Sequence, residues 1–429
     1  MDIAAVALVA ATIFAWGTVS ARLERADLTA PIVFVAVGAI LAALGLFHTP
    51  SAPETLKPLV EVTLVWVLFS DAARVRVPDL GKDLGRFARL LGIGLPLTVV
   101  FGWVLALWLV PGQGVWLALL VAAALAPTDA ALGVPVVTNP AVPSRVRRLI
   151  TVESGLNDGI ATPLVVVAIA GAASAEGLAE APGMGKALVE LAVGVIVGVA
   201  VGFVGGGLLR WARHRGWSAE EFAGIAVLAL AVCSYAGALV VGGNGFVAAF
   251  CGGLAFGAAA GRRGPVEVLF LEQASGLVSL LVWIAFGVIA VPIVLEGVDL
   301  TTALYAVLSL TVVRMLPVAL ALIGAGLDRR TVLFVGWFGP RGLASLVFAL
   351  LAVEELGPQA DPAVVAIAVT VFLSVLAHGA SAAPMAARYG KAVDTREPEP
   401  GDPVPDIPVR GLPRRLGPPG VRESGSPER

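Results

Sequence analysis

Charged side chains are scarce in this chain. Asp, Glu, Lys and Arg make up 14% of its 429 residues, whereas hydrophobic residues make up 58%. Soluble domains carry roughly 25% charged residues, and so few charges cannot cover a surface that faces water. A lipid bilayer removes that need, so the composition excludes a soluble globular domain and predicts an integral membrane protein. The net charge of −2 gives no sign of a nucleic-acid partner, and we expect none.

Cysteine and histidine are nearly absent. Both cysteines, Cys233 and Cys251, fall inside apolar segments, so we interpret them as packing residues and predict no disulfide. The three histidines do not combine with cysteine or carboxylates at the spacing of a zinc site. The sequence also lacks a nucleophile elbow and a phosphate-binding loop. We therefore expect no resident cofactor and no enzymatic activity.

Long apolar stretches fill most of the chain. A transmembrane helix needs about 20 apolar residues to cross roughly 30 Å of hydrocarbon. Stretches of this kind, bounded by charges, proline or glycine, predict an all-α polytopic membrane domain over residues 1–390. We place about 13 transmembrane helices, at residues 3–20, 30–48, 58–75, 87–110, 114–140, 145–172, 186–209, 220–240, 243–260, 268–294, 300–326, 331–353 and 362–388.

The loop charges predict the orientation. Lys and Arg concentrate in cytoplasmic loops, and here they concentrate in the odd-numbered connections, with Lys57 the main exception. This alternation places the N-terminus outside and the C-terminus in the cytoplasm, in the plasma (inner) membrane. The basic residues concerned include Arg22, Arg25, Arg74, Arg76, Lys82, Arg86, Arg89, Arg145, Arg147, Arg148, Arg210, Arg213, Arg215, Arg262, Arg263, Arg329 and Arg330.

The composition changes near residue 391. Residues 391–429 are rich in Pro, Gly, Arg and Glu and almost free of aromatic residues. Such a segment cannot bury enough apolar surface to offset the entropy that it would lose on ordering. We expect a disordered cytoplasmic tail.

Asp129 is a charged residue within a predicted membrane segment, where charges are costly and usually functional. Pro127 and Pro135 flank it, and each removes a backbone donor and disfavours helix before it. The helix should break here, as helices of many transporters do where they bind ions. The alternative is a simple proline kink with Asp129 at the membrane interface.

The next segment carries two carboxylates, in Glu153-Ser154-Gly155-Leu156-Asn157-Asp158-Gly159. Glu153 and Asn157 are four residues apart, as are Ser154 and Asp158, so each pair shares a helix face. Ser154 and Asp158 would present a hydroxyl and a carboxylate together, and hard cations prefer oxygen ligands of this kind. The alternative is a set of polar groups that only hold helices together.

Two arginines lie in later predicted segments. Arg314 is mid-helix and needs an anionic partner, which we assign to Glu153. Arg341, in Gly339-Pro340-Arg341-Gly342, marks a second predicted break and would offset exposed helix C-termini there. The two breaks fall in segments five and twelve, at corresponding positions of two six-helix halves. This pattern predicts inverted repeats.

Three motifs together resemble the monovalent cation:proton antiporter family 1, which contains the NhaP-type Na⁺/H⁺ antiporters and the sodium/hydrogen exchangers. They are Pro127-Thr128-Asp129, Glu153 to Gly159, and Gly339 to Gly342, with a further match at Gly245 to Leu254. The resemblance covers about residues 1–390. It implies thirteen helices in two inverted repeats, with helices five and twelve unwound at a crossing, and a homodimer.

The resemblance also assigns roles to residues. It implies that Asp158 is the main cation-binding and proton-binding carboxylate, and that Asp129, Ser154 and the backbone of Thr128 complete a Na⁺ site. Asn157, where related electrogenic antiporters carry a second Asp, implies one-for-one electroneutral exchange. Glu153 and Arg314 would form a structural ion pair. Asp71, in Phe69-Ser70-Asp71-Ala72, stands where family members often have an acidic residue near the inner end of helix three.

We therefore predict a secondary transporter that exchanges a monovalent cation, Na⁺ before K⁺ or Li⁺, for H⁺ by alternating access. The partners would be the cation, protons and membrane lipid. A cation channel is the first rival, but a pore-lining ring or carbonyl filter motif is not evident. A symporter for an organic solute is the second, although the chain has only three tyrosines and such sites usually hold more aromatic groups.

Overall fold

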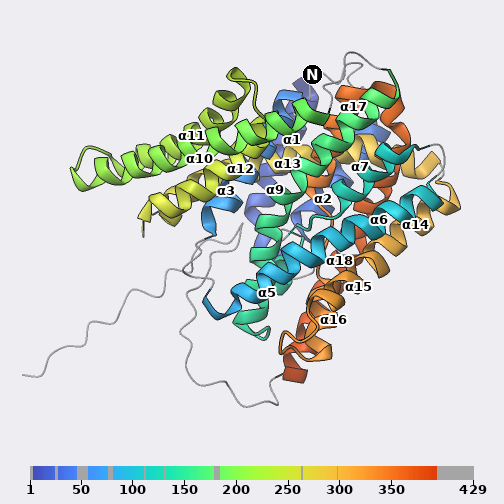
Figure 1. Ribbon diagram of the computed structural model, residues 1–429. Coiled ribbons are helices and arrows are strands. Elements are labelled where there is room, and N and C mark those ends of the chain that lie inside the picture. The colour runs from blue at the N-terminus through green and yellow to red at the C-terminus, as the bar shows by residue number, and fades with distance from the viewer. Residues whose placement is uncertain are drawn as a thin grey trace, which may run out of the picture.

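The computed structural model describes residues 3–24, 28–45, 57–75, 81–110, 113–129, 132–177, 184–261, 264–296 and 298–393. Within these ranges all regular secondary structure is helical (Figure 1), which confirms the all-α prediction. The helices are α1 (Ile3–Glu24), α2 (Ala30–Ala43), α3 (Lys57–Arg74), α5 (Leu84–Arg89), α6 (Leu95–Leu109), α7 (Val115–Leu125), α8 (Val134–Val137), α9 (Ser144–Ala175), α10 (Met184–His214), α11 (Glu220–Val240), α12 (Gly245–Ala259), α13 (Gly264–Glu296), α14 (Leu300–Leu310), α15 (Val312–Ala321), α16 (Arg329–Trp337), α17 (Leu343–Leu356) and α18 (Asp361–Val393), with short helical turns η2 (Gly81–Asp83), η3 (Leu90–Gly94) and η5 (Gly357–Ala360).

Several helices are long and apolar enough to cross a bilayer. In the described part of the chain eight stretches meet that criterion, and α2, α7 and α12 are shorter apolar helices. Each predicted apolar segment contains at least one helix. The eight stretches are Val6–Leu23, Leu84–Leu109, Ser144–Ala175, Gly185–His214, Glu220–Val240, Val266–Ile289, Leu300–Ala321 and Leu343–Val393. The predicted tail lies outside the described residues, apart from 391–393, which continue α18.

The eleventh predicted segment differs from expectation because it is interrupted. Thr311 separates α14 from α15 with φ −107° and ψ −87°. Its hydroxyl donates to the Val307 carbonyl at 2.7 Å, a back-bond that bends helices. Pro317, which lacks an N–H, further weakens the helix that follows. The irregular turn lies three residues before Arg314.

Glycines bring α10 and α12 into close contact. Gly194, Gly198, Gly202 and Gly206 follow at every fourth position of α10, so they share one face. A Cβ on any of them would meet a backbone carbonyl oxygen of α12 or of the residue that caps it. The oxygens belong in turn to Asn244, Ala248, Gly252 and Phe256. Because both numbers rise by four together, the two helices run parallel, packed as small residues allow in membranes.

Two further pairs pack in the same way. A Cβ on Gly38 of α2 would collide with the Ile284 carbonyl of α13. On α12, a Cβ on Gly253 would collide with the carbonyl of Phe69, and one on Gly257 would approach the carbonyl of Ala73, both on α3. The pairs α2–α13 and α3–α12 therefore have similar close, glycine-mediated contacts.

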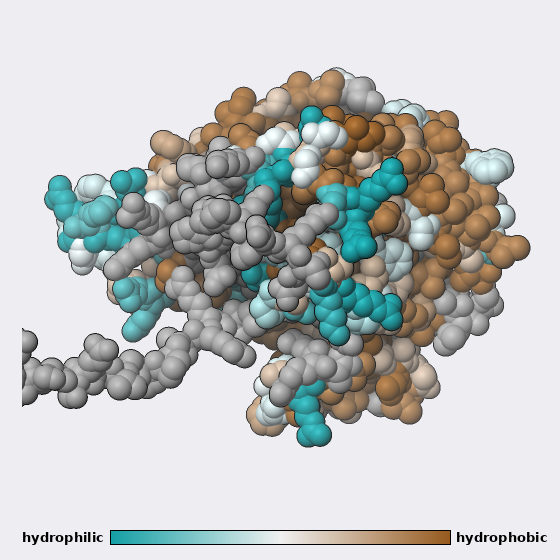
Figure 2. Space-filling view, turned by 90° about the horizontal axis from the view of Figure 1, so that it is seen from below, coloured by the Kyte–Doolittle hydropathy of each residue, from teal (hydrophilic) through white to brown (hydrophobic). Residues whose placement is uncertain are grey.

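The surface combines apolar walls with polar ends. Large apolar side chains are exposed on several helices, and Trp108, Val240 and Leu300 are more than four-fifths exposed. Seen from below, much of the rim is hydrophobic, while hydrophilic residues gather nearer the middle and at one end of this face (Figure 2). This division fits helices with lipid around them and water beyond their ends.

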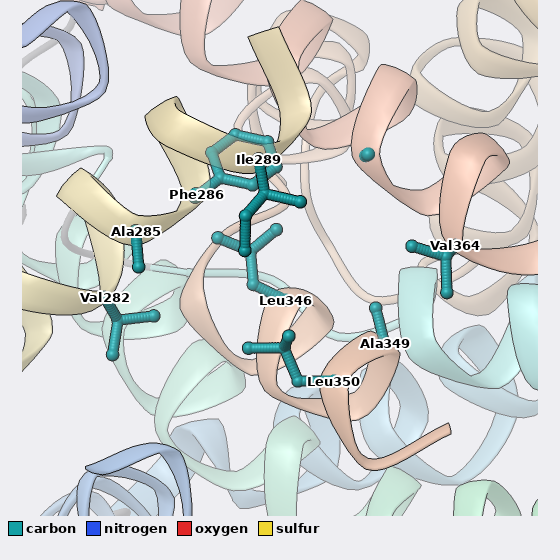
Figure 3. Close-up of a pocket in the computed structure, with 9 residues that line it drawn as sticks. Val282, Ala285, Phe286, Ile289, Leu346, Ala349, Leu350 and Val364 are labelled. Carbon is teal, nitrogen blue, oxygen red and sulfur yellow. The ribbon is translucent and has the colours of Figure 1, made fainter. Parts of the chain in front are cut away.

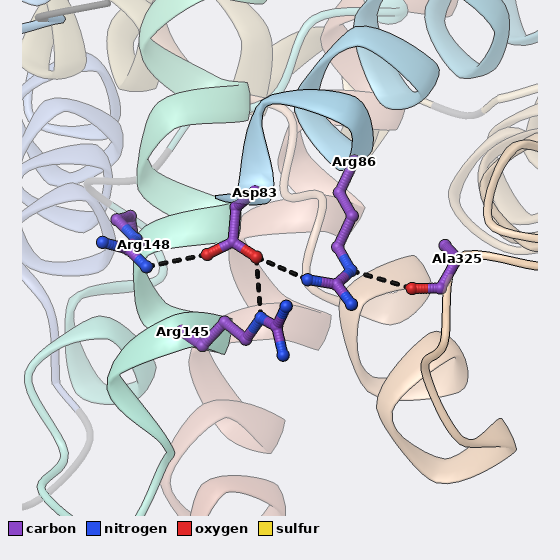
Figure 4. Close-up of polar contacts among 5 residues, drawn as sticks. All are labelled: Asp83, Arg86, Arg145, Arg148 and Ala325. Atoms are coloured by element: carbon purple, nitrogen blue, oxygen red, sulfur yellow. Dashed lines mark hydrogen bonds and ion pairs between the residues drawn. The ribbon is translucent and has the colours of Figure 1, made fainter. Parts of the chain in front are cut away.

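Asp83, the last residue of η2, contacts three arginines (Figure 4). Its Oδ1 accepts hydrogen bonds from Arg86 and from Nε of Arg145 at 2.7 Å, and its Oδ2 accepts from Nη2 of Arg148 at 2.7 Å. Nε of Arg86 also donates to the Ala325 carbonyl at 2.9 Å. Asp83 thus connects α5, the start of α9 and the loop before α16.

Candidate functional site

Two non-helical stretches lie side by side in the interior. The helix α7 ends at Leu125 and is followed by extended backbone at 128–129, while α16 ends at Trp337 and α17 starts only at Leu343. The amide of Asp129 donates to the Pro340 carbonyl at 2.7 Å, which joins the two stretches. Pro127 and Pro340 cannot donate a backbone hydrogen bond. The breaks therefore occur where these prolines predict them.

Arg341 donates hydrogen bonds to backbone carbonyl groups at the end of α7. Its side chain is fully buried, and Nη1 donates to the carbonyls of Ala126 at 2.7 Å and of Pro127 at 3.1 Å. The last carbonyls of a helix lack intrahelical partners and carry partial negative charge. The guanidinium compensates this charge, the role that the sequence predicts for Arg341.

Asp129 accepts a hydrogen bond from the first backbone amide of α17. Its Oδ2 accepts a hydrogen bond from the Leu343 amide at 3.1 Å. A carboxylate is favourable at a helix N-terminus because the first amides are unpaired and the dipole is positive there. Gly342 makes room for this contact, since a Cβ at that position would collide with the carboxylate. Asp129 was expected as a cation ligand, and the structure gives one of its oxygens this capping contact.

Thr128 is the centre of a buried polar cluster. Its Oγ1 lies 2.9 Å from Ser154 Oγ and accepts a hydrogen bond from Nδ2 of Asn157 at 2.7 Å. All three side chains are buried. The Oδ1 of Asn157 is buried without a hydrogen-bond partner among the described residues. The resemblance implied the backbone of Thr128 as a ligand, whereas the side chain makes the contacts seen here.

Asp158 follows Asn157 on α9 and is 8% exposed. The helix places it one turn after Ser154, on the same face. Asp71 on α3 lies close by, because a Cβ on Gly155 would be 3.7 Å from the Cβ of Asp71. The structure therefore groups Asp158, Ser154, Asn157 and Thr128 in one region of α9 and the α7 break, with Asp71 packed against the same helix.

Phe250 is a residue that sequence reasoning missed. A Cβ on Gly159 would collide with the ring of Phe250, so the ring packs directly on the residue after Asp158. Phe250 lies on α12 and is 8% exposed. Phe250 thus places an apolar ring against α9 one residue beyond Asp158. Gly159 is the feature of the sequence that indicates such a contact, because a residue without a side chain leaves space for a neighbouring group.

Glu153 and Arg314 form a buried ion pair. Arg314 Nη1 lies 2.6 Å from Glu153 Oε1, and the two residues are 1% and 3% exposed. The guanidinium also packs against Gly339, where a Cβ would collide with it. The pair thus links α9 and α15, and Arg314 also contacts the non-helical stretch between α16 and α17.

A separate pocket lies between α13 and the pair α17–α18 (Figure 3). It has an empty volume of about 450 Å³ and only apolar lining side chains. Such a surface offers no oxygen ligand to a cation. The lining residues are Val282, Ala285, Phe286, Ile289, Leu346, Ala349, Leu350, Val364 and Ala368. The polar cluster at Thr128 and Asp158 remains the candidate site.

The chain is similar in sequence to several known proteins. The K⁺/H⁺ antiporter NhaP of Alkalimonas amylolytica is 26% identical over 342 residues, which cover 78% of this chain and 58% of that protein. NhaP2 of Shewanella sp. (strain MR-4), also named a K⁺/H⁺ antiporter, is 28% identical over 386 residues, covering 87% of this chain and 64% of that protein. The chain thus spans under two thirds of the length of these relatives.

A solved structure shares the fold. The sodium proton antiporter MjNhaP1 of Methanocaldococcus jannaschii superposes with a TM-score of 0.70 at 19% identity, covering 90% of this chain and 99% of that chain. The family model described as sodium/hydrogen exchanger, transmembrane, matches residues 8–388. A match over nearly all the described helices means that this chain belongs to the sodium/hydrogen exchanger family.

Proposed function

We propose that the protein exchanges a monovalent cation for H⁺ across a membrane. The observation that carries the proposal is the cluster of Thr128, Ser154 and Asn157 beside the buried Asp158, at a point where two broken helices meet. Oxygen ligands at a helix break are what transporters use to bind small cations. From the sequence, Na⁺ is the first candidate and K⁺ or Li⁺ are alternatives; relatives are named as K⁺/H⁺ and as probable Na⁺/H⁺ antiporters.

Competition at one carboxylate couples the two fluxes. Burial disfavours a charged carboxylate unless a counter-charge is bound, so Asp158 takes either a proton or the cation. Protonation removes the charge that holds the cation and expels it. Rocking of one helix bundle against another then exposes the site to the opposite side. Two ligands that exclude each other at a shared site give obligatory exchange.

Asp158 would be the main charged ligand of the cation, together with oxygen atoms of neighbouring residues. Ser154 and Thr128 contribute hydroxyl or backbone oxygens, and the unpartnered Oδ1 of Asn157 adds an amide oxygen. Asp129, which follows Thr128, and Asp71, which packs against α9 at Gly155, are the further acidic residues of the proposed site. Because Asn157 stands where related electrogenic antiporters carry a second Asp, the family resemblance implies that the exchange is one for one and electroneutral.

The membrane architecture proposed is thirteen helices in two inverted six-helix repeats, with an outside N-terminus and a cytoplasmic C-terminus in the plasma (inner) membrane. The two similar close pairs α2–α13 and α3–α12 support it. If segments one to six match eight to thirteen, the pair of segments two and ten maps onto the pair nine and three. Residues 1–390 form the transporter domain. We also propose a homodimer, by analogy with the family.

Two other functions have less support. A channel needs a continuous pore, whereas the polar cluster is enclosed by buried side chains and by the ring of Phe250. An organic-solute symporter needs a larger polar cavity, and the pocket at α13, α17 and α18 is apolar. Neither rival explains a carboxylate beside hydroxyl and amide oxygens at a helix break.

Reconstitution into liposomes tests the proposal. The purified protein is placed in liposomes with an internal pH dye, a proton gradient is imposed, and Na⁺, K⁺ or Li⁺ is added with and without a K⁺/valinomycin clamp. We expect one or more cations to dissipate the gradient equally at every clamped voltage. No response to any cation would overturn the exchange function, and a voltage-dependent response would overturn electroneutrality.

A further inference from the structure

His378 is a buried polar residue that cation exchange, as described above, does not use. It lies on α18 and is fully buried. Its ring stacks on Trp337, with ring centres 5.0 Å apart and planes at 27°. Trp337 is the last residue of α16, directly before the unwound stretch 338–342. His378 therefore lies at one end of that stretch.

One ring nitrogen of His378 forms a hydrogen bond with the last residue of α16. Nε2 lies 2.9 Å from the Trp337 carbonyl oxygen, which also accepts the Gly339 amide at 2.8 Å. A carbonyl oxygen can only accept a hydrogen bond, and it is the partner of Nε2 among the described residues, whereas Nδ1 also lies beside a hydroxyl from which it can accept. We therefore assign the single proton of the neutral ring to Nε2. Because the last carbonyls of a helix lack intrahelical partners, this bond satisfies a group at the end of α16.

The other ring nitrogen reaches the far end of the stretch through Ser374. Nδ1 lies 3.2 Å from Ser374 Oγ and 3.0 Å from the Ser374 carbonyl oxygen, one turn earlier on α18. Ser374 Oγ in turn accepts the Arg341 amide at 2.7 Å. In the neutral ring with its proton on Nε2, the serine hydroxyl donates to Nδ1. A chain of hydrogen bonds therefore runs from Trp337 to Arg341 across the whole break.

We infer that His378 and Ser374 are positioning residues that clamp the unwound stretch 338–342 onto α18. The inference rests on the proposed cation exchange. The clamped stretch includes Pro340, whose carbonyl accepts the Asp129 amide at 2.7 Å. Asp129 follows Thr128, which bonds Ser154 and Asn157. The clamp thus determines where Thr128 lies, although His378 touches none of the ligands.

The test uses the full-length protein in proteoliposomes and compares His378→Phe, His378→Gln and Ser374→Ala. Phenylalanine keeps the ring and its stack on Trp337 but removes both hydrogen bonds. Glutamine can place its amide nitrogen near the position of Nε2 and retain only the bond to Trp337. Ser381→Ala is the matched control, because Ser381 lies on the same helix and accepts a hydrogen bond from the indole of Trp337 at 3.0 Å.

Two quantities are measured in each variant: the cation concentration for half-maximal exchange, and hydrogen–deuterium exchange of the peptide that covers 338–343. We expect His378→Phe and Ser374→Ala to raise the half-maximal concentration about 3- to 10-fold and to accelerate deuterium uptake at Arg341. His378→Gln should fall between these variants and the wild type. Ser381→Ala should change neither quantity.

The outcomes separate the clamp from the exchange function. Unchanged deuterium uptake in His378→Phe and Ser374→Ala overturns the clamp, and faster uptake with an unchanged half-maximal concentration overturns its positioning role. If His378→Phe does not fold, Ser374→Ala and His378→Gln decide by the same criteria. A wild type that neither exchanges nor is thermally stabilised by Na⁺, K⁺ or Li⁺ overturns the exchange function and the positioning role with it, while deuterium uptake still decides whether the clamp exists.

Discussion

Arg341 and Asp129 each cap a helix that belongs to the other's broken segment. Arg341 precedes α17 and donates to the last carbonyls of α7, and Asp129 follows α7 and accepts the first amide of α17. The amide of Asp129 also donates to Pro340, directly before Arg341. Both helix ends at this crossing are therefore compensated by a residue from the opposite chain segment, which allows broken helices to exist away from water.

Replacing Asp158 with Asn should abolish exchange. The amide cannot alternate between a proton and a cation, so the two fluxes lose their shared charge. Gradient dissipation in proteoliposomes measures the effect. Asp299→Asn is the control, because Asp299 is an exposed acid, and it should exchange like the wild type. Cation-driven exchange in Asp158→Asn would exclude Asp158 as the shared site.

Removing Glu153 should destabilise the fold. Glu153→Ala leaves Arg314 buried without its anionic partner, and breaking a buried pair costs about 3–5 kcal/mol. Thermal unfolding in detergent and folded yield report the loss. Glu221→Ala, at an exposed acid on α11, should behave like the wild type.

The double variant Glu153→Ala/Arg314→Met separates the pair from each residue alone. It removes both charges, so it should be more stable than Glu153→Ala. Equal stability of Glu153→Ala and the wild type would contradict a structural role for the pair.

A side chain at Gly342 should weaken the cap of α17. Gly342→Ala forces the Asp129 carboxylate away from the Leu343 amide, and overpacking of this kind costs about 1–3 kcal/mol. We expect slower exchange and a lower unfolding temperature. Gly114→Ala is a close control, because Gly114 also precedes a helix, α7, but has open space around its Cβ position. Similar behaviour of both variants would argue against a specific contact at Gly342.

One methyl group on α10 should distinguish its two faces. Gly202→Ala pushes the new Cβ into the Gly252 carbonyl of α12, whereas Gly207→Ala meets open space on the same helix. We expect Gly202→Ala to lower the unfolding free energy by about 1–3 kcal/mol and Gly207→Ala to leave it unchanged or raise it slightly. The melting temperatures of the two variants give the comparison. A neutral Gly202→Ala would exclude tight packing of α10 on α12.

The loss of stability on replacing each arginine around Asp83 should depend on how buried that arginine is. Asp83→Ala leaves several guanidinium groups close together without the carboxylate that joins them, so it should destabilise the protein most, by about 3–5 kcal/mol. Arg148, whose side chain is 13% exposed, should matter more than Arg145, which is 38% exposed. Exposed pairs contribute about 1 kcal/mol or less. Equal melting temperatures for Arg148→Ala and Arg145→Ala would contradict this order.

Local features of the sequence predicted much of the site. Pro127 and Pro340 indicated where helices break, because proline cannot donate to a helix wherever it lies in the fold. The spacing of Ser154 and Asp158 indicated a shared face of one helix for the same local reason. Glu153 was named as the partner of Arg314 because a buried cation needs an anion, and these residues are in contact 161 positions apart.

Contacts between distant segments could not be read in this way. The capping role of Asp129 depends on α17, which begins more than 200 residues later, and the side chain of Thr128 lies at the centre of the cluster only because the α7 break meets α9. The interruption at Thr311 lies inside an apolar stretch that predicts one continuous segment. His378 and Ser374 read as polar residues of one helix, without any sign of the break that they contact.

The membrane environment, the helical class and the positions of the breaks follow from composition, apolar periodicity and proline, because these act through covalent geometry and at short range. Which oxygen faces which helix end, and which residues meet at the site, follows from how the folded helices pack. These contacts depend on the register between packed helices. Glycine faces, such as that of α10 against α12, set this register to within one turn. Register depends on the surfaces of both helices, so the sequence of one helix does not determine it.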